Sequence, residues 1–255
     1  ILRTSVELAD MPQGTSPITV ALISDIHVAG PDMPPDRLER IVTQINALNA
    51  DAVLIAGDLV SEKRPATYIY EADEIIAHLS GLKARLGVYL VPGNHDHWYG
   101  WPSLTKELAR TDITVLANEA AEVGPLVLGG LDDEYTGHDD IAKTQAAMDK
   151  LTGAHVFLGH SPDSLPDLPQ GSIILAGHTH CGQIKLPLVG AIATASRYGQ
   201  RYVCGRTDEP GGTAIVGAGL GTSVLPFRFG TRPEVWLIEL RPAGSDLRRS
   251  VATPE

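Results

Sequence analysis

Short apolar runs alternate with one-sided helical patterns over the first ninety residues, and this alternation limits the fold more than any other feature. Residues 18–23, 52–56 and 88–91 form largely apolar runs rich in β-branched residues, which are typical of buried strands. Apolar residues recur at helical spacing between the first and second runs, at Leu38, Ile41, Val42, Ile45 and Leu48. A similar pattern lies between the second and third runs. This β-α-β-α-β order predicts parallel strands joined by helical crossovers.

The helical signal fades after Gln183. Short runs at residues 184–186, 201–204, 214–216 and 235–240 predict a mostly antiparallel second half. No linker divides the chain, so we expect one domain over residues 1–255 that contains two packed sheets. We place its core at residues 17–242 and expect residues 1–16 and 243–255 to be peripheral or flexible.

Metal-capable side chains follow five of the apolar runs directly. They form five groups in chain order: Asp25 and His27; Asp58; Asn94, His95 and Asp96; His160; His178 and His180. In α/β sheets, ligands gather beyond the carboxyl ends of the strands, so all five groups are expected on one rim. Four of the runs end in a glycine, at Gly57, Gly93, Gly159 and Gly177, which either permits close backbone approach or simply ends the strand.

Charge and composition exclude several classes of protein. The 255 residues include 31 acidic and 20 basic side chains, a net charge of -11, which disfavours a sequence-blind binder of nucleic acids or anionic membranes. No apolar run approaches the ~18 residues that a membrane helix requires. Because the first residue is Ile1 rather than Met, we expect the natural N-terminus, and any signal or anchor, to lie outside this sequence.

Two cysteines, Cys181 and Cys204, exclude a disulfide scaffold and a thiolate zinc ribbon. We interpret Cys181, beside His180, as a packed thiol rather than a ligand, and the sequence leaves its pairing with Cys204 open. His97 either lines the pocket or has an ordinary loop role. Four arginines either contact phosphate oxygens or are surface charges, and none is assigned to the site: Arg197, Arg201, Arg228 and Arg232.

The five groups, taken in order, resemble the blocks of the calcineurin-like metallophosphoesterases: D-x-H, G-D, G-N-H-D/E, G-H and G-H-x-H. The resemblance implies a four-layer α/β/β/α sandwich with two metal ions. By the family pattern, the first ion would be held by Asp25, His27, Asp58 and His180. Asp58 would bridge to the second ion, which Asn94, His160 and His178 would complete. His95 would be the catalytic residue that faces the substrate phosphate.

Two departures from related patterns are informative. Protein phosphatases of this superfamily carry G-D-x-x-D-R-G, in which the second Asp orients the catalytic histidine, whereas Leu59, Val60 and Ser61 follow Asp58 here. A Ser/Thr protein phosphatase is therefore disfavoured. The residues after the last block, from Gly182-Gln183 to Pro233-Glu234, are similar to a bacterial phosphodiesterase branch that is often membrane-associated, except that Cys181 replaces a glycine. The branch implies a bacterial protein, cytoplasmic or attached to a membrane through a segment absent from this chain.

Mixed Asp, Asn and His ligands suit Mn, Fe or Zn. Two such ions can lower the pKa of a bridging water, whose hydroxide would attack phosphorus in line. We therefore predict a binuclear phosphohydrolase, and among these a phosphodiesterase, whose substrate is a small-molecule or lipid-linked phosphodiester or pyrophosphate. The alternatives are a pyrophosphatase acting on a nucleotide-linked lipid, which needs an apolar groove, and a catalytically silent protein-binding scaffold of the same fold.

Overall fold

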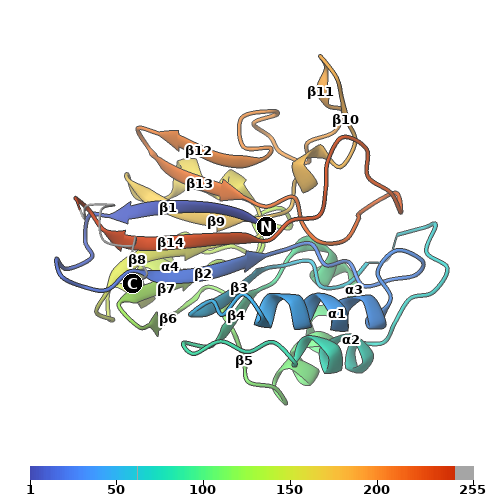
Figure 1. Ribbon diagram of the computed structural model, residues 1–255, viewed down its shortest axis with the longest axis horizontal. Coiled ribbons are helices and arrows are strands. Elements are labelled where there is room, and N and C mark those ends of the chain that lie inside the picture. Colours follow the sequence, from blue (N-terminus) through green and yellow to red (C-terminus); the bar gives the residue numbers. More distant parts are fainter. Residues whose placement is uncertain (62, 245–255) are drawn as a thin grey trace, which may run out of the picture.

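Two six-stranded sheets lie face to face in the computed structural model, which describes residues 1–61 and 63–244 (Figure 1). The first sheet contains the predicted alternation, because β2, β3 and β4 pair in parallel and α1 and α2 connect them. Its spatial order is β1 (Leu2–Leu8), β14 (Trp236–Pro242), β2 (Ile18–Ile23), β3 (Ala52–Ala56), β4 (Val88–Val91) and β5 (Ile113–Val115).

Our expectation of mostly antiparallel pairing after Gln183 is borne out in part: three of the five strand pairings there are antiparallel, whereas the pairings with residues 172–176 and with residues 2–8 are parallel. The second sheet combines strands from before and after Gln183. Its four inner strands, β13, β9, β8 and β7, run parallel, and only the edge strands β12 and β6 are antiparallel to their neighbours. The hairpin of β12 and β13 joins the sheet through β13, which pairs in parallel with β9. The spatial order is β12 (Gly205–Glu209), β13 (Gly212–Val216), β9 (Ser172–Ala176), β8 (Ala154–Leu158), β7 (Leu126–Gly130) and β6 (Glu119–Val123).

Other predicted strands in this half also differ. Residues 201–204 form no strand, and the next strand begins at Gly205. The run at 184–186 contributes β10 (Lys185–Leu186), which pairs only with β11 (Gly190–Ala191) in a small hairpin that stands off the body (Figure 1). The last run becomes β14, which inserts between β1 and β2 in the first sheet.

The N-terminal segment is not peripheral, contrary to our expectation for residues 1–16. Residues 2–8 form β1, which pairs in parallel with β14 along its whole length. Val6 and Leu8 are buried between the sheets. The prediction failed because an edge strand with one exposed face lacks a continuous apolar run. At the other terminus, residues 245–255 of the segment that we expected to be peripheral lie outside the described residues.

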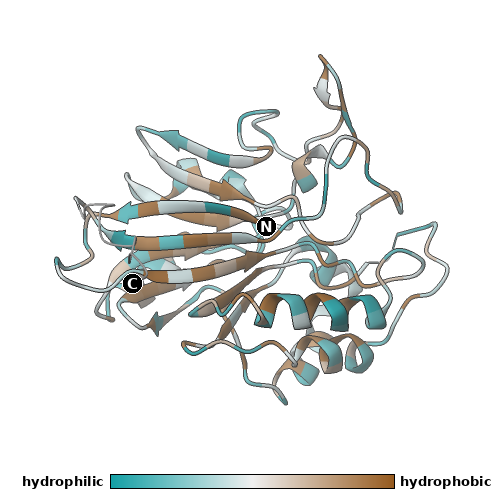
Figure 2. Cartoon of the chain, in the orientation of Figure 1, coloured by the Kyte–Doolittle hydropathy of each residue, from teal (hydrophilic) through white to brown (hydrophobic). Residues whose placement is uncertain are grey.

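Helices cover the outer faces of both sheets. On the first sheet lie α1 (Pro35–Asn46), α2 (Ala72–Leu79) and α3 (Asn94–Leu108) (Figure 1). On the second lie α4 (Ile141–Met148) and the 3-10 helix η1 (Pro162–Asp167). Figure 2 shows hydrophilic and hydrophobic residues alternating around α1 and α2, as helices with one buried face require. Within the described chain, none of the helices combines the length and apolar character needed to cross a membrane.

Alternate residues of each central strand pack into different layers. In β2, Val20 and Leu22 are buried between the two sheets, whereas Ala21 and Ile23 face the helices. This double burial explains why the central strands have continuous apolar sequences. Three apolar layers result: helix against sheet, sheet against sheet, and sheet against helix. The four-layer α/β/β/α sandwich is therefore confirmed.

Candidate metal centre

The structure brings all seven predicted ligand side chains together at one end of the sandwich. Each follows the carboxyl end of a strand: Asp25 and His27 after β2, Asp58 after β3, Asn94 after β4, His160 after β8, and His178 and His180 after β9. The first four belong to the first sheet and the other three to the second, so the two sheets share the site. Every one of these residues is at most 6% exposed.

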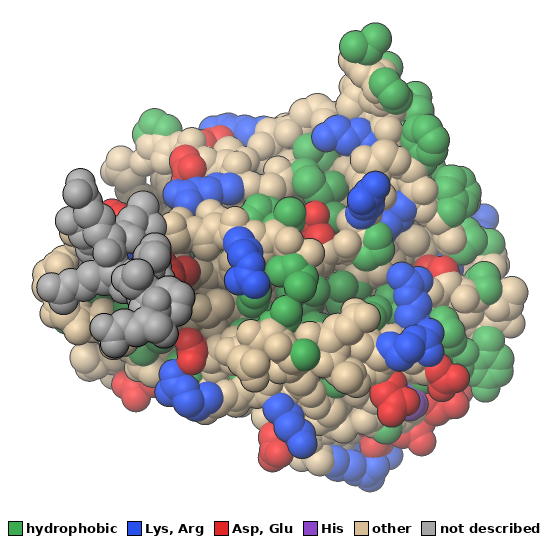
Figure 3. All heavy atoms as spheres, viewed as in Figure 1, with side chains coloured by type: hydrophobic (Ala, Val, Ile, Leu, Met, Phe, Trp, Pro, Cys, Tyr) green, Lys and Arg blue, Asp and Glu red, His purple; other side chains and the backbone are tan. Residues whose placement is uncertain are grey.

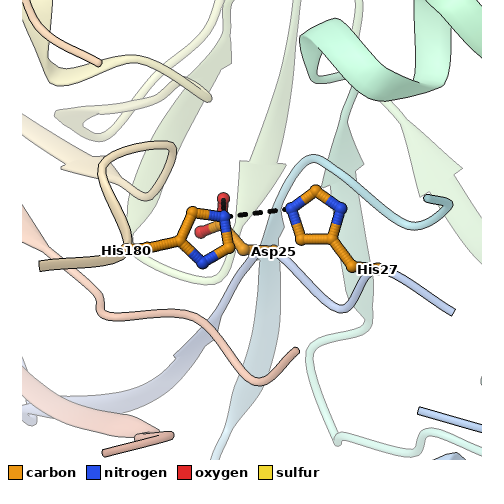
Figure 4. A group of neighbouring side chains, drawn as sticks. All are labelled: Asp25, His27 and His180. Carbon is orange, nitrogen blue, oxygen red and sulfur yellow. Dashed lines mark hydrogen bonds and ion pairs between the residues drawn. The ribbon is translucent and has the colours of Figure 1, made fainter. Parts of the chain in front are cut away.

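One group of ligand atoms surrounds His27. Its Nε2 lies 3.0 Å from His180 Nε2 and 3.5 Å from Asp58 Oδ2. His180 Nε2 lies 3.3 Å from Asp25 Oδ1. Figure 4 shows the rings of His27 and His180 turned toward one another beside the Asp25 carboxylate. These four residues form the first predicted ligand set, and their nitrogen and oxygen atoms converge.

A second group surrounds His160. Its Nε2 lies 3.2 Å from Asp58 Oδ2, 3.1 Å from Asn94 Oδ1 and 3.1 Å from His178 Nδ1. These residues form the second predicted ligand set. Asp58 Oδ2 is the atom that approaches both His27 and His160, so the carboxylate stands between the two groups.

Backbone carbonyls orient three of the imidazole rings. His27 Nδ1 donates to Val60 O at 3.0 Å, His160 Nδ1 to Ala56 O at 2.7 Å, and His178 Nε2 to Ala195 O at 2.8 Å. In each ring the other nitrogen faces the centre. Burial lowers the pKa of His27 and of His178, so in these two neutral rings that nitrogen carries a lone pair.

The electrostatics of the site suit cations. Burial lowers the pKa of His178 to about 4 and that of His180 to about 3, so both rings are neutral near pH 7. Although burial opposes ionisation, the neighbouring His160 and His27 hold the pKa of Asp58 well below its usual range. The Asp58 carboxylate likewise raises the pKa of His160 against the effect of burial. A metal ion would replace the proton that His160 directs at Asp58, and the donor set therefore fits divalent metals.

Backbone strain is concentrated at the same residues. Five of the seven have positive φ angles: 49° at Asp25, 49° at His27, 58° at Asp58, 69° at His178 and 53° at His180. Non-glycine residues rarely adopt this left-handed conformation, and it persists where the surrounding structure fixes it, as at functional sites. The turns after β2, β3 and β9 thus aim side chains inward at a conformational cost.

Three of the four strand-ending glycines are required by close approach to predicted ligand residues. A Cβ at Gly57 would lie 2.7 Å from His160 Nδ1. A Cβ at Gly93 would lie 2.6 Å from Asp58 N and still closer to the Asp58 carboxylate, and one at Gly177 would lie 2.5 Å from Asp25 Oδ2. Gly159 differs, because a Cβ there would meet only apolar side chains of Ile174 and Leu131. The structure thus separates the two alternatives that the sequence left open for these glycines.

The buried Asp96, which the sequence places in the third group without a role as ligand or catalyst, supports the turn that carries Asp58. Its carboxylate accepts N–H groups of Asp58 at 2.9 Å, Leu59 at 2.8 Å and Gly93 at 2.9 Å. Burial and the Asp58 carboxylate raise the pKa of Asp96. Its signal in the sequence is the acidic residue at the third position of α3, where a carboxylate caps the helix.

Arg228 is the second residue whose role the sequence did not assign. Its guanidinium donates to the carbonyls of Ala218 and Gly221, and its Nη2 lies 3.3 Å from His180 Nδ1. It is therefore tied to backbone carbonyls rather than being a free surface charge, and the other role that the sequence left open, contact with phosphate oxygens, stays a prediction. It joins residues 218–221 to the last ligand block.

His95 lies at the wall of an adjoining cleft. Its ring makes an edge contact with His27, with 4.7 Å between centroids, and its Nε2 lies 3.4 Å from Ser223 Oγ. The cleft has a volume of about 460 Å³, and most of its lining away from the ligands is apolar: Trp98, Tyr135, Ile184, Ile192, Ala193, Ala195, Val224 and Leu225. His97 does not line this cleft; it contacts Asp132 and stacks on His138.

Cys181 is not a packed thiol, because it forms a disulfide with Cys204, with 4.6 Å between the Cα atoms. The bond joins the residue after His180 to the residue before β12. The sequence could not decide this pairing because it depends on distance. Since both sulfurs are bonded to one another, neither is a thiolate ligand.

Comparison with known proteins agrees with this site. A sequence model of the calcineurin-like phosphoesterases matches residues 18–182, which include all five blocks. An uncharacterized metallophosphoesterase of Helicobacter pylori strain J99 is 31% identical over 88% of this chain and 60% of its own. The uncharacterized metallophosphoesterase YkuE of Bacillus subtilis is 30% identical over 91% of this chain and 82% of its own length. A Danio rerio transmembrane protein with a metallophosphoesterase domain is 30% identical over 95% of this chain and 57% of its own length.

The chain thus spans about three fifths of the length of the Helicobacter and Danio relatives. Among solved structures, the 5'-nucleotidase precursor from Thermus thermophilus matches with a TM-score of 0.45 and 15% identity, over 79% of this chain and 48% of that one. The family match covers more than half of the sequence and includes every residue of the candidate centre. The chain therefore belongs to the calcineurin-like phosphoesterase family.

Proposed function

We propose that this protein is a metal-dependent phosphodiesterase with a binuclear centre. The observation that carries the proposal is the position of Asp58, whose Oδ2 lies 3.5 Å from His27 Nε2 and 3.2 Å from His160 Nε2. Seven ligand-type residues are too many for one four-coordinate ion, whereas two sets that share one carboxylate suit two ions. When bound, two divalent ions supply an acidified water and charge stabilisation for the phosphoryl oxygens.

The chain's own groups would orient and protonate the substrate. His95 faces the cleft, so a phosphate placed there would meet its imidazole. As an imidazolium it would protonate the departing alkoxide or stabilise charge on the phosphoryl oxygens, a contribution typically of ~10²–10⁴ in rate. The Val60 and Ala56 carbonyls fix the rings of His27 and His160, which keeps the ligand atoms in position before substrate arrives.

The cleft favours a diester over a monoester. Near neutral pH a phosphomonoester carries close to two negative charges, and a diester carries one. None of the described residues that line the cleft is Lys or Arg, so apart from the metal ions and His95 no cationic group of the lining is available for the second charge. The absence of the G-D-x-x-D-R-G pattern supports the same choice.

Hydrolysis of bis-p-nitrophenyl phosphate and p-nitrophenyl phosphate, measured with the same metal, tests the substrate class. We expect faster turnover of the diester, and a clear preference for the monoester would contradict the proposal. Elemental analysis of active protein should give two metals per chain. Asp58→Ala should lose both, whereas Asp36→Ala, an exposed carboxylate on α1, should keep both. A single metal in fully active protein would contradict the binuclear centre.

A pyrophosphatase acting on a nucleotide-linked lipid is the second candidate, because it needs an apolar groove and the cleft has an apolar wall. A nucleoside diphosphate joined to a lipid distinguishes the two. Release of nucleoside monophosphate at a rate far above that of diester hydrolysis would favour the pyrophosphatase. Metal-loaded protein that cleaves neither substrate would favour the silent scaffold.

A further inference from the structure

Exposed apolar side chains gather beside the candidate centre. Of the fourteen large hydrophobic side chains that are exposed in the described chain, eight belong to residues 184–193 and 223–229. We call these two segments the apolar rim; its exposed members are Leu186, Leu188, Val189, Ile192, Val224, Leu225, Phe227 and Phe229. Figure 3 shows hydrophobic side chains at the tip of the β10–β11 hairpin and along the edge below it. Exposed apolar clusters of this kind mark interaction surfaces.

Hydrogen bonds join the two segments of the rim. The Gln183 side chain donates to Leu225 O at 2.9 Å and Phe227 O at 3.0 Å, and accepts from Ser223 N at 2.8 Å. The Lys185 N–H donates to Phe229 O at 2.7 Å. The rim is thus held as one unit, and it begins shortly after the ligand His180.

The rim differs in charge from the rest of the protein. The chain has a net charge of -11, yet residues 184–193 and 223–229 contain no Asp or Glu. Their only charged residues are Lys185 and Arg228. A surface without carboxylates lacks the groups that cost most to bring near hydrocarbon. The charge distribution therefore suits an apolar partner with phosphate at its surface.

Leu188, at the tip of the hairpin, is held in an unfavourable way. It is fully exposed, and its φ of 67° is one that Gly or Asn adopts more easily. A leucine here improves neither the turn nor the core. Because the hairpin stands off the body (Figure 1), a flat protein partner would contact few of these side chains, whereas a bilayer would surround them.

We propose that the apolar rim inserts into the surface of a phospholipid bilayer and brings the cleft to the phosphodiester of a lipid in that bilayer. Ile184, Ile192, Val224 and Leu225 belong to the rim and also line the cleft that contains His95, so the apolar surface is continuous with the site. The cleavage of the lipid rests on the proposed function, whereas the insertion does not.

Sedimentation with phosphatidylcholine vesicles, in chelator so that no hydrolysis is needed, tests the insertion. The wild-type chain should bind, with little change on raising the salt concentration, because the contact is apolar. Leu188→Asn introduces a residue that adopts this φ more easily and should lower the partition coefficient about tenfold, as should Phe227→Ser. Ile69→Ser, which removes an exposed apolar side chain on the loop before α2, should bind like the wild type. Thermal melts of each variant show whether the fold is intact.

Failure of wild-type binding, equal binding by the rim variants, or binding that high salt abolishes would overturn the insertion. So would a dimer that Leu188→Asn dissociates, because the rim would then cover a second copy. A metal-loaded chain should also hydrolyse vesicle phosphodiester lipids, detected by mass spectrometry of the extracted lipids. If it binds vesicles but cleaves neither these lipids nor bis-p-nitrophenyl phosphate, the proposed function fails and the insertion stands. If it cleaves only the soluble diester, the lipid substrate is wrong.

Discussion

Replacing Gly93 by alanine tests whether the turn before α3 sets the position of the shared carboxylate. The backbone of Gly93 is not left-handed, so alanine fits its φ and ψ, and the only new feature is a methyl group. That carbon would lie 2.6 Å from Asp58 N and closer still to the Asp58 carboxylate, against an ordinary contact of about 3.4–4 Å. Asp58 must therefore move by roughly one ångström. Because its carboxylate stands between both ligand groups, both metal sites should be distorted.

The substitution should lower both the stability of the fold and the affinity for metal. Overpacking of this kind costs about 1–3 kcal/mol of folding free energy. In a domain of this size it should lower the Tm by roughly 2–4 °C per kcal/mol. Displacing a ligand resembles the loss of its supporting hydrogen bonds, which typically costs ~10–100-fold in metal affinity. We expect at least that loss for both ions in Gly93→Ala.

Gly129→Ala is the matched control. Its Cβ would also collide, but with the Sδ of Met148, the flexible end of a side chain outside the site. Calorimetric titration of the metal-free protein with the metal should show weakened binding of both ions in Gly93→Ala and wild-type affinity in Gly129→Ala. Thermal melts without metal should show that both variants remain folded. If Gly93→Ala binds two ions with wild-type affinity, the close approach does not determine the position of Asp58, and our explanation of the glycine is wrong.

Three further substitutions test separate contacts. His95→Ala should keep both metals and lose ~10²-fold or more in turnover, with a smaller loss for p-nitrophenolate than for an alkyl leaving group, as steady-state kinetics would show. Equal losses would instead assign His95 to charge stabilisation, and loss of metal would make it a ligand. Asp96→Asn removes one carboxylate oxygen that accepts N–H groups and should weaken metal binding by ~10–100-fold in the same calorimetric titration. Cys204→Ser opens a link of sequence separation 23 and should cost about 3 kcal/mol, measured by chemical unfolding; unchanged stability would refute this.

Local patterns of the sequence were sufficient to predict most of the fold and the residues of the candidate site. Apolar runs marked the parallel strands of the first sheet, and the groups after them met as predicted because strand ends of one direction share an edge. Asp58 and His160 lie 102 positions apart in the sequence, yet each follows a buried strand, which is sufficient to place both at the rim. The role of these residues as ligands stays a prediction that metal analysis would test.

The features that the sequence did not predict depend on long-range contacts. The pairing of β1 with β14 joins residues more than 200 positions apart, and β1 shows too little alternation to be recognised alone. Arg228 contacts His180 only because residues 218–221 fold back over the last ligand block. The disulfide and the parallel inner strands of the second sheet likewise require knowledge of which segments lie side by side.

The insertion of β14 between β1 and β2 makes assembly depend on nearly the whole described chain. During synthesis, β2 emerges with Asp25 and His27 at its end, but one of its edges stays unpaired until residues 236–240 have left the ribosome. β1 also stays unpaired until then, because β14 is its partner in the sheet. Open edges of this kind promote aggregation, and pairing between distant segments is slow. A nascent chain cut short before residue 236 would therefore contain every predicted ligand and still lack the strand that pairs with one edge of β2, which carries the first two.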